Sequence, residues 1–159
     1  MMKYFIWLLI GVVLGASGYW LFQQYSSVSV SPPVTRTILV YFSKSEPTDI
    51  VQVAVERTII KTVAVATAAM QELLKGPTEA EKAEGLTTAI NAGTVLNYVK
   101  IDAGVATVDF NEQFDWQMGG SARVQAIYQQ IFKTLTRFSV VDDIIITINH
   151  GERLANLEP

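Results

Sequence analysis

The chain has 159 residues, of which 17% are charged and 50% are hydrophobic, and its formal net charge is −3. The absence of cysteine excludes disulfides, thiolate metal sites, a cysteine nucleophile and a thioether-linked lipid. The negative net charge gives no general attraction to nucleic acid or anionic lipid, so we expect no nucleic-acid partner.

The N-terminus carries an apolar segment over residues 4–22, and no charged residue occurs between Lys3 and Arg36. As a helix this segment would rise about 28 Å, close to the thickness of a bilayer's hydrocarbon core. We therefore predict a transmembrane anchor over residues 1–22, with the C-terminal domain outside the cytoplasmic membrane. A signal peptide cleaved near Ala16-Ser17-Gly18, which would release a soluble protein, is the alternative.

Two further features concern this segment. Leu14-Gly15-Ala16-Ser17 is similar to a lipoprotein signal, but serine stands where the lipidated cysteine is required, so the helix itself must hold the protein. Gly11 and Gly15 have the spacing that lets membrane helices pack closely, which predicts self-association through this face. Residues 23–36, rich in serine and containing Pro32-Pro33, are predicted to be a spacer.

A hairpin and a helix are predicted next. Residues 37–42 are β-branched and aromatic, and residues 49–59 alternate valine with other side chains, as half-buried strands do. The apolar period becomes helical over residues 63–75. Gly76 is expected to cap this helix, and Pro77 prevents its continuation.

The second half begins with an exposed helical turn over residues 78–85, where Thr78 and Glu81 have capping-box spacing. We then predict, in order, a short strand at 86–90, a turn at 91–94, a strand at 95–101, a hairpin turn at Asp102-Ala103-Gly104, a strand at 105–111, an irregular loop at 112–121, a helix at 123–138 capped by Ser121, and a strand at 143–154. Residues 37–159 thus form one α+β domain, with two helices packed on one mixed or antiparallel sheet.

Candidate catalytic residues are sparse. His150 is the only histidine and follows a strand, where an exposed turn position is expected. The nearest approach to an acid cluster is Asp102, Asp109, Glu112 and Asp115, and two such acids can hydrolyse a glycoside if they lie about 5–9 Å apart. We assign these acids to turns and surface. Gly119-Gly120-Ser121 lacks the lysine of a phosphate loop. We predict no catalytic residue, no metal, no cofactor and no small-molecule substrate.

The loop before the last helix contains Phe114, Trp116 and Met118. Three large apolar side chains in an irregular segment predict a contact surface for a protein partner, although they also suit the edge of the core.

An ordered set of motifs then resembles a known family. The motifs are Leu73-Leu74-Lys75-Gly76-Pro77, Glu84-Gly85-Leu86, Gly93-Thr94, residues 99–110 with Gly104 and Asp109, residues 133–138, and the closing residues 141–151. Together they resemble the GerMN domain of sporulation and spore-germination proteins, over about residues 37–157. Asn91 departs from the family, which often has proline there, and this chain has one such domain instead of a tandem pair.

The resemblance implies a structural role for Gly76, Pro77, Gly85, Gly93, Gly104 and Asp109. It also implies a non-catalytic, extracytoplasmic domain similar to ring-building modules, which assemble with envelope proteins or with copies of themselves. A role in sporulation does not follow from the resemblance. A glycan-binding or cell-wall hydrolytic module, suggested by the acids and Trp116, is the alternative from another functional class.

Overall fold

The computed structural model describes residues 19–20 and 32–155 and divides the chain into two units, residues 1–33 and Val34–Pro159. In the first unit, Tyr19 and Trp20 are helical and exposed. The rest of the predicted anchor, including Gly11, Gly15 and Ser17, lies outside the described residues. Among the described residues, no helix has the length and apolar character that a membrane crossing requires.

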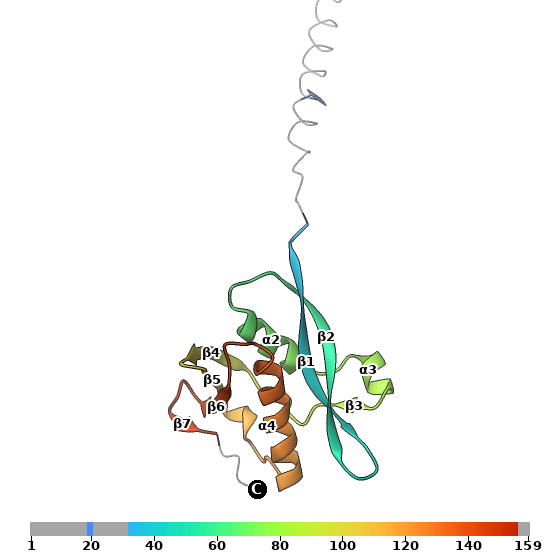
Figure 1. Ribbon diagram of the computed structural model, residues 1–159, viewed down its shortest axis with the longest axis vertical. Helices are drawn as coiled ribbons and strands as arrows, with labels where there is room; N and C mark the ends of the chain where they lie inside the picture. Colours follow the sequence, from blue (N-terminus) through green and yellow to red (C-terminus); the bar gives the residue numbers. More distant parts are fainter. Residues whose placement is uncertain (1–18, 21–31, 156–159) are drawn as a thin grey trace, which may run out of the picture. The chain divides into compact units, whose positions relative to one another are not determined.

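The second unit contains strands and helices in mixed order (Figure 1). They are β1 (Thr35–Ser45), β2 (Ile50–Ile60), α2 (Val65–Leu74), α3 (Glu79–Ala83), β3 (Leu86–Thr87), β4 (Leu96–Asp102), β5 (Val105–Phe110), the 3-10 turn η1 (Glu112–Phe114), α4 (Ser121–Leu135), β6 (Asp143–Ile148) and β7 (Arg153–Leu154). The α+β class is confirmed. Thr35 and Arg36, predicted to be spacer, already pair with β2.

The strands form two sheets, where one had been predicted. The first sheet has the order β2-β1-β3 and the second the order β4-β5-β6-β7. Helix α4 connects β5 to β6, which run parallel, and all other neighbours are antiparallel. Both α2 and α4 contact strands of each sheet, so the helices join the two sheets into one unit.

Side chains of α4 explain why β1 does not continue into a larger sheet. The Tyr41 N–H, on the edge of β1 away from β2, donates to Thr134 Oγ1 at 3.1 Å. The Tyr41 carbonyl accepts from Gln130 Nε2 at 3.3 Å. Gln130 and Thr134 are fully buried, and they satisfy backbone groups that another strand would otherwise have paired.

The predicted C-terminal strand over 143–154 is wrong as a single element, because it is two strands. Asn149, His150 and Gly151 have φ angles of 53°, 62° and 84°. Three consecutive residues in the left-handed region cannot continue an extended chain, so β6 ends and β7 returns beside it. Sequence periodicity does not register this turn because its only strong signal is Gly151.

Helix α4 begins and ends earlier than expected. Gly120 is its N-cap, and Ser121 is the first helical residue and makes no capping hydrogen bond. The predicted capping box is confirmed, because Thr78 and Glu81 form both of its hydrogen bonds at the start of α3.

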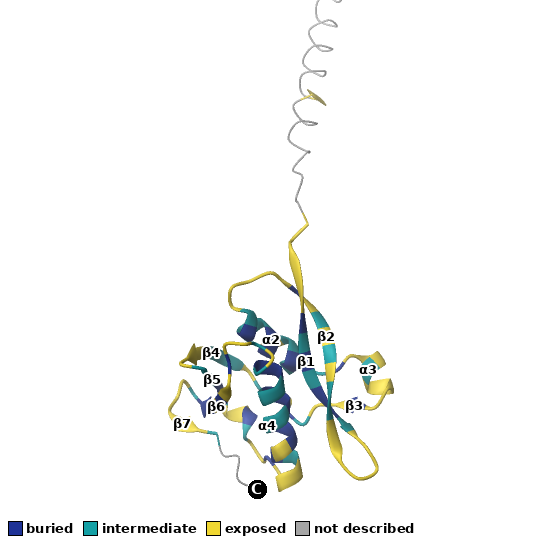
Figure 2. Cartoon of the chain, viewed as in Figure 1, coloured by how far each residue is buried: buried dark blue, intermediate teal, exposed yellow. Residues whose placement is uncertain are grey.

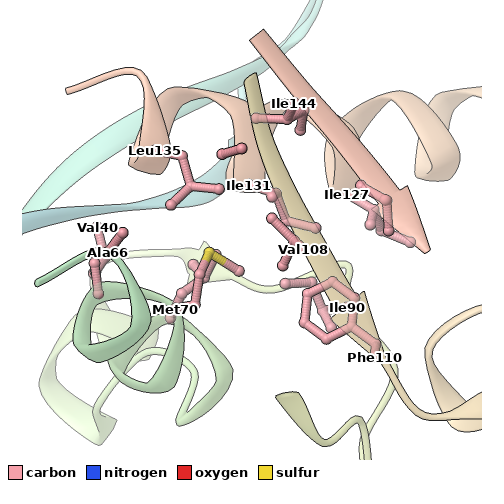
Figure 3. Packing of buried hydrophobic residues seen from close by; sticks show 14 of the residues in the cluster. Val40, Ala66, Met70, Ile90, Val108, Phe110, Ile127, Ile131, Leu135 and Ile144 are labelled. Atoms are coloured by element: carbon pink, nitrogen blue, oxygen red, sulfur yellow. The ribbon is translucent and has the colours of Figure 1, made fainter. Parts of the chain in front are cut away.

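One hydrophobic core lies between the sheets and helices. It includes Val40 and Phe42 of β1, Met70 and Leu73 of α2, and a row along one face of α4. Figure 3 shows side chains from α2, α4 and β5 converging in this core, and Figure 2 shows exposed residues concentrated at the ends of the hairpin and on α3.

Candidate functional site

The predicted structural residues lie at turns and in the core. The glycines at 76, 85, 93 and 104 have φ angles of 75°, 88°, 82° and 85°, and Pro77 is buried. Gly104 bears the tightest constraint. Its carbonyl accepts from the N–H groups of Asp142 and Asp143 at 2.7 and 3.2 Å, and an added Cβ would lie 2.5 Å from Asp142 Oδ2. The β4–β5 turn is thereby joined to the start of β6.

Asp109 is the acid most deeply placed in the domain, with no exposed surface. Its Oδ1 accepts from Asn97 Nδ2 at 2.7 Å and from the His150 N–H at 2.8 Å. Its Oδ2 accepts from Thr147 Oγ1 at 2.6 Å and from the Gly151 N–H at 2.8 Å. Four donors from β4, β6 and the following turn therefore meet on one carboxylate.

Burial alone would raise the pKa of Asp109, but the hydrogen bonds from Thr147, Asn97, His150 and Gly151 outweigh it and lower the pKa. The carboxylate is ionised and holds the turn between β6 and β7 in its left-handed conformation. No lone pair is left to face a substrate, so Asp109 is a structural residue.

The other acids of the sequence cluster are either paired with neighbouring side chains or exposed on their own. Asp115 accepts both guanidinium nitrogens of Arg153, at 2.5 and 3.0 Å, and Glu112 accepts from Asn149 Nδ2 at 2.8 Å. Asp102 is exposed at the β4–β5 turn. Among the described residues, no group of three or more His, Cys, Asp or Glu side chains is arranged to hold a metal ion.

The predicted apolar contact surface is reduced to one residue. Phe114 is fully buried and stacks on Phe110 with ring centroids 4.4 Å apart, and Met118 is also buried. Trp116 alone is exposed, at 61% of its surface. The alternation of buried and exposed residues arises because η1 turns Phe114 inward, which an irregular sequence does not indicate.

Asn91 holds the loop that carries Trp116, a role that sequence reasoning missed. Its Nδ2 donates to the carbonyls of Gln113, Phe114 and Trp116 at 3.0, 3.0 and 2.7 Å. Its Oδ1 accepts from Arg123 Nη2 at 2.6 Å. The departure from the expected proline at this position was the one available signal.

A shallow hollow of about 440 Å³ lies beside the indole of Trp116. Its lining consists of Glu112, Asp115, Trp116, Gln117 and Arg153. The Asp115–Arg153 ion pair and the Asn91 contacts fix both walls. The hollow thus offers one exposed aromatic face surrounded by planar polar side chains.

A second candidate surface is the outer edge of β2. Strand β2 pairs with β1 through eleven consecutive residue pairs without a bulge, and in the described part of the chain no strand pairs with its other edge (Figure 1). The strand contains no proline and no lysine, two residues that commonly protect sheet edges, and of its two charged residues Arg57 is paired with Glu81.

The fold and these surfaces define a small α+β domain that presents a free strand edge and one structured aromatic loop. The chain belongs to the Germane family, described as sporulation and spore germination, whose model matches residues 39–154. No curated protein matches the chain significantly.

Solved structures agree with the family. The tandem GerMN domains of the sporulation protein GerM from Bacillus subtilis are 25% identical, with a TM-score of 0.63, over 80% of this chain and 44% of that one. The chain thus spans less than half of that tandem structure. The first GerMN domain of the same protein is 27% identical, with a TM-score of 0.55, over 76% of this chain and 86% of that one. A structure from Clostridium perfringens is 16% identical, with a TM-score of 0.51, over 77% of this chain and 82% of that one, and supports the fold alone.

Proposed function

We propose that the chain is a single-pass membrane protein whose GerM-like domain assembles with envelope proteins, or with copies of itself, at the outer face of the bacterial cytoplasmic membrane. The observation that carries this proposal is the outer edge of β2, with which no strand of the described residues pairs. A strand edge of this length binds an added strand through main-chain hydrogen bonds, as in β-augmentation.

The register of the hairpin identifies the free backbone groups. Because the Lys61 N–H donates to the Val34 carbonyl at 2.8 Å, odd-numbered residues of β2 face β1. The N–H groups of Gln52, Ala54, Glu56 and Thr58 therefore point away from the hairpin. Ala54, Glu56 and Thr58 are exposed, which leaves room for an incoming strand.

The membrane location rests on the sequence of residues 4–22, which is uncharged and long enough to span a bilayer. The GerM structures named above come from a sporulation protein, and the assembly role itself rests on the β2 edge. Among the described residues, Asp109, Glu112 and Asp115 are each hydrogen-bonded or ion-paired, which favours binding over catalysis.

Ala54→Pro tests the proposed edge. Proline removes the outward N–H of Ala54 but leaves the ladder to β1 intact, so folding is expected to persist. In-cell crosslinking with partner identification should capture an envelope protein, or the chain itself, with the wild type and with Ala54→Thr, but not with Ala54→Pro. Equal capture by all three variants, or no capture at all, would contradict the proposal.

A second candidate function is glycan binding at the hollow beside Trp116. It is favoured by the exposed indole and by the polar side chains of Asp115, Gln117 and Arg153 around it, since an aromatic face and planar hydrogen-bonding groups suit a sugar ring. The hydrolytic form of this idea is not favoured, because Asp109 is buried and saturated with hydrogen bonds.

Sedimentation with purified peptidoglycan tests this candidate. Trp116→Ala should abolish co-sedimentation, while Val95→Ala, which trims another exposed apolar side chain, should not. Release of soluble fragments would instead support a hydrolytic function. Equal sedimentation of both variants would exclude Trp116 as the binding residue.

A further inference from the structure

We infer that the end of the domain where the spacer enters is a docking surface for anionic lipid. This linker-proximal surface consists of Val34, Arg36, Lys61, Val63, Arg137 and Val140. The inference rests on the proposed function for its location, because it requires the domain to lie near a membrane.

The apolar side chains of this surface are unusually exposed. Val63 is fully exposed, and Val34 and Val140 are exposed at 67% and 61%. Val63 and Val140 line one hollow of about 480 Å³ together with Ile101 and Phe138. Val34 is next to it, since it lies two residues before Arg36, which also lines the hollow. Figure 2 shows this end of the hairpin as exposed.

Cations accompany these apolar side chains. Arg36 and Arg137 line the same hollow, whose lining contains no Asp or Glu. Lys61 follows β2 and bonds through its backbone to Val34. All three cations are exposed, and within the described residues none of the three forms an ion pair. Three acids border this region. Glu72 is paired with Lys75 at 2.6 Å. Asp102, next to Ile101, and Asp142, two residues after Val140, are exposed and do not line the hollow.

Exposed valines among unpaired cations match the interface of an anionic bilayer, where apolar groups insert at headgroup level and cations contact lipid phosphates. The net charge of −3 does not oppose this, because screening limits each charge to about 10 Å at moderate salt. Chain connectivity points to the same occupant. Residues 23–33 join the predicted span directly to Val34, and eleven residues reach at most about 40 Å.

The domain can be tested without its anchor, because the core extends from Ile38 to Ile148 and uses no residue of the first unit. Residues 32–159 would be floated with vesicles of phosphatidylcholine and with vesicles that also contain phosphatidylglycerol. We expect binding only to the anionic vesicles and loss of binding at high salt. Each of Arg36→Gln and Arg137→Gln should weaken partitioning roughly fivefold.

Matched control variants distinguish binding through this surface from nonspecific binding to vesicles. Val63→Ser with Val140→Ser should weaken binding, whereas Val95→Ser and Lys82→Gln, which alter exposed residues elsewhere, should leave it unchanged. All these positions are exposed, so folding is retained and is checked by circular dichroism. Absence of binding to anionic vesicles, or equal losses in the control variants, would overturn the inference. Neither outcome affects the β2 edge, which crosslinking tests separately.

Discussion

Asp109 lies in a sequence cluster of acids that suggests catalysis, yet its surroundings make it a structural residue. Its four hydrogen bonds come from three different segments, and the turn after β6 depends on two of them. A buried carboxylate without a cation is stable only when its lone pairs are satisfied in this way.

Asp109→Asn should therefore destabilise the domain strongly. The amide turns its NH2 group toward the Gly151 N–H or toward the His150 N–H, and a backbone N–H cannot accept, so at least one hydrogen bond is replaced by a contact between two donors. We expect a loss of about 3 kcal/mol in the free energy of unfolding, measured by urea denaturation. Asp102→Asn, at an exposed position, should change it by less than about 0.5 kcal/mol. Equal effects at both positions would contradict the assignment.

Two acids also set the pH dependence of stability. Hydrogen bonds from Arg57, which outweigh desolvation, lower the pKa of Glu81 to about 2, and the pKa of Asp109 is lowered as well. Both folded-state pKa values lie below the unfolded ones, so the stabilisation by each acid is present above its unfolded pKa and is lost as the pH falls through its folded pKa. For Glu81 this loss runs from about pH 4.5 to about 2.

Glu81→Gln tests this dependence. The variant should be less stable than the wild type near neutral pH, and the difference should shrink as the pH approaches about 2, where Glu81 becomes protonated. Denaturation curves at several pH values measure it. A difference that is constant with pH would show that Glu81 stabilises through packing instead of charge.

Two substitutions in the β4–β5 turn should change the stability of the domain in opposite directions. Ala103 and Gly104 both have positive φ, the conformation for which Asn-Gly is preferred. Gly104→Ala should cost about 1–2 kcal/mol, while Ala103→Asn should add about 0.5–1 kcal/mol. Thermal melting measures both, and a destabilising Ala103→Asn would contradict this description of the turn.

At the scale of elements, α4 serves both as a core helix and as a cap for the edge of β1. Thr134 accepts from the Tyr41 N–H and donates to the Gln130 carbonyl at 2.7 Å. Thr134→Val keeps the shape and leaves the Tyr41 N–H unpaired, so it should cost about 1–3 kcal/mol. Thr134→Ser should recover most of that loss. Urea denaturation measures these changes. If Thr134→Val left the free energy of unfolding unchanged, α4 would not be closing this edge.

Local sequence signals predicted the elements well where they act over short distances. The β1–β2 hairpin, the capping box of α3 and the turn at Gly104 all follow from residues within a few positions of one another. The division into two sheets could not be predicted from nearby residues, because Gln130, Thr134 and Tyr41 meet only after α4 has packed. The same limit hid the burial of Phe114, which depends on Phe110 and η1.

The candidate surfaces were predicted only in part. Trp116 emerged as a possible contact residue, but the roles of Asn91 and Arg123 in holding its loop are long-range and leave no local pattern. The free edge of β2 could not be identified from the sequence, because that requires knowledge of the strand pairing.

For the molecule as a whole, the surfaces have distinct assignments. The free edge of β2 is assigned to a protein strand, the linker-proximal surface to lipid, and the hollow beside Trp116 is the second candidate site. The β2 edge and the linker-proximal surface are compatible because Arg36 and Lys61 lie at one end of the hairpin and the turn after Ser45 lies at the other, so most of β2 lies away from that surface.

Amide hydrogen exchange tests the central claim most directly. In the monomeric domain, the N–H groups of Gln52, Ala54, Glu56 and Thr58 should exchange rapidly, while those of Val53, Val55 and Arg57 are protected by β1. In the assembled complex recovered from membranes, all seven should be protected. Continued rapid exchange of the four outward amides in that complex would contradict strand pairing at the β2 edge.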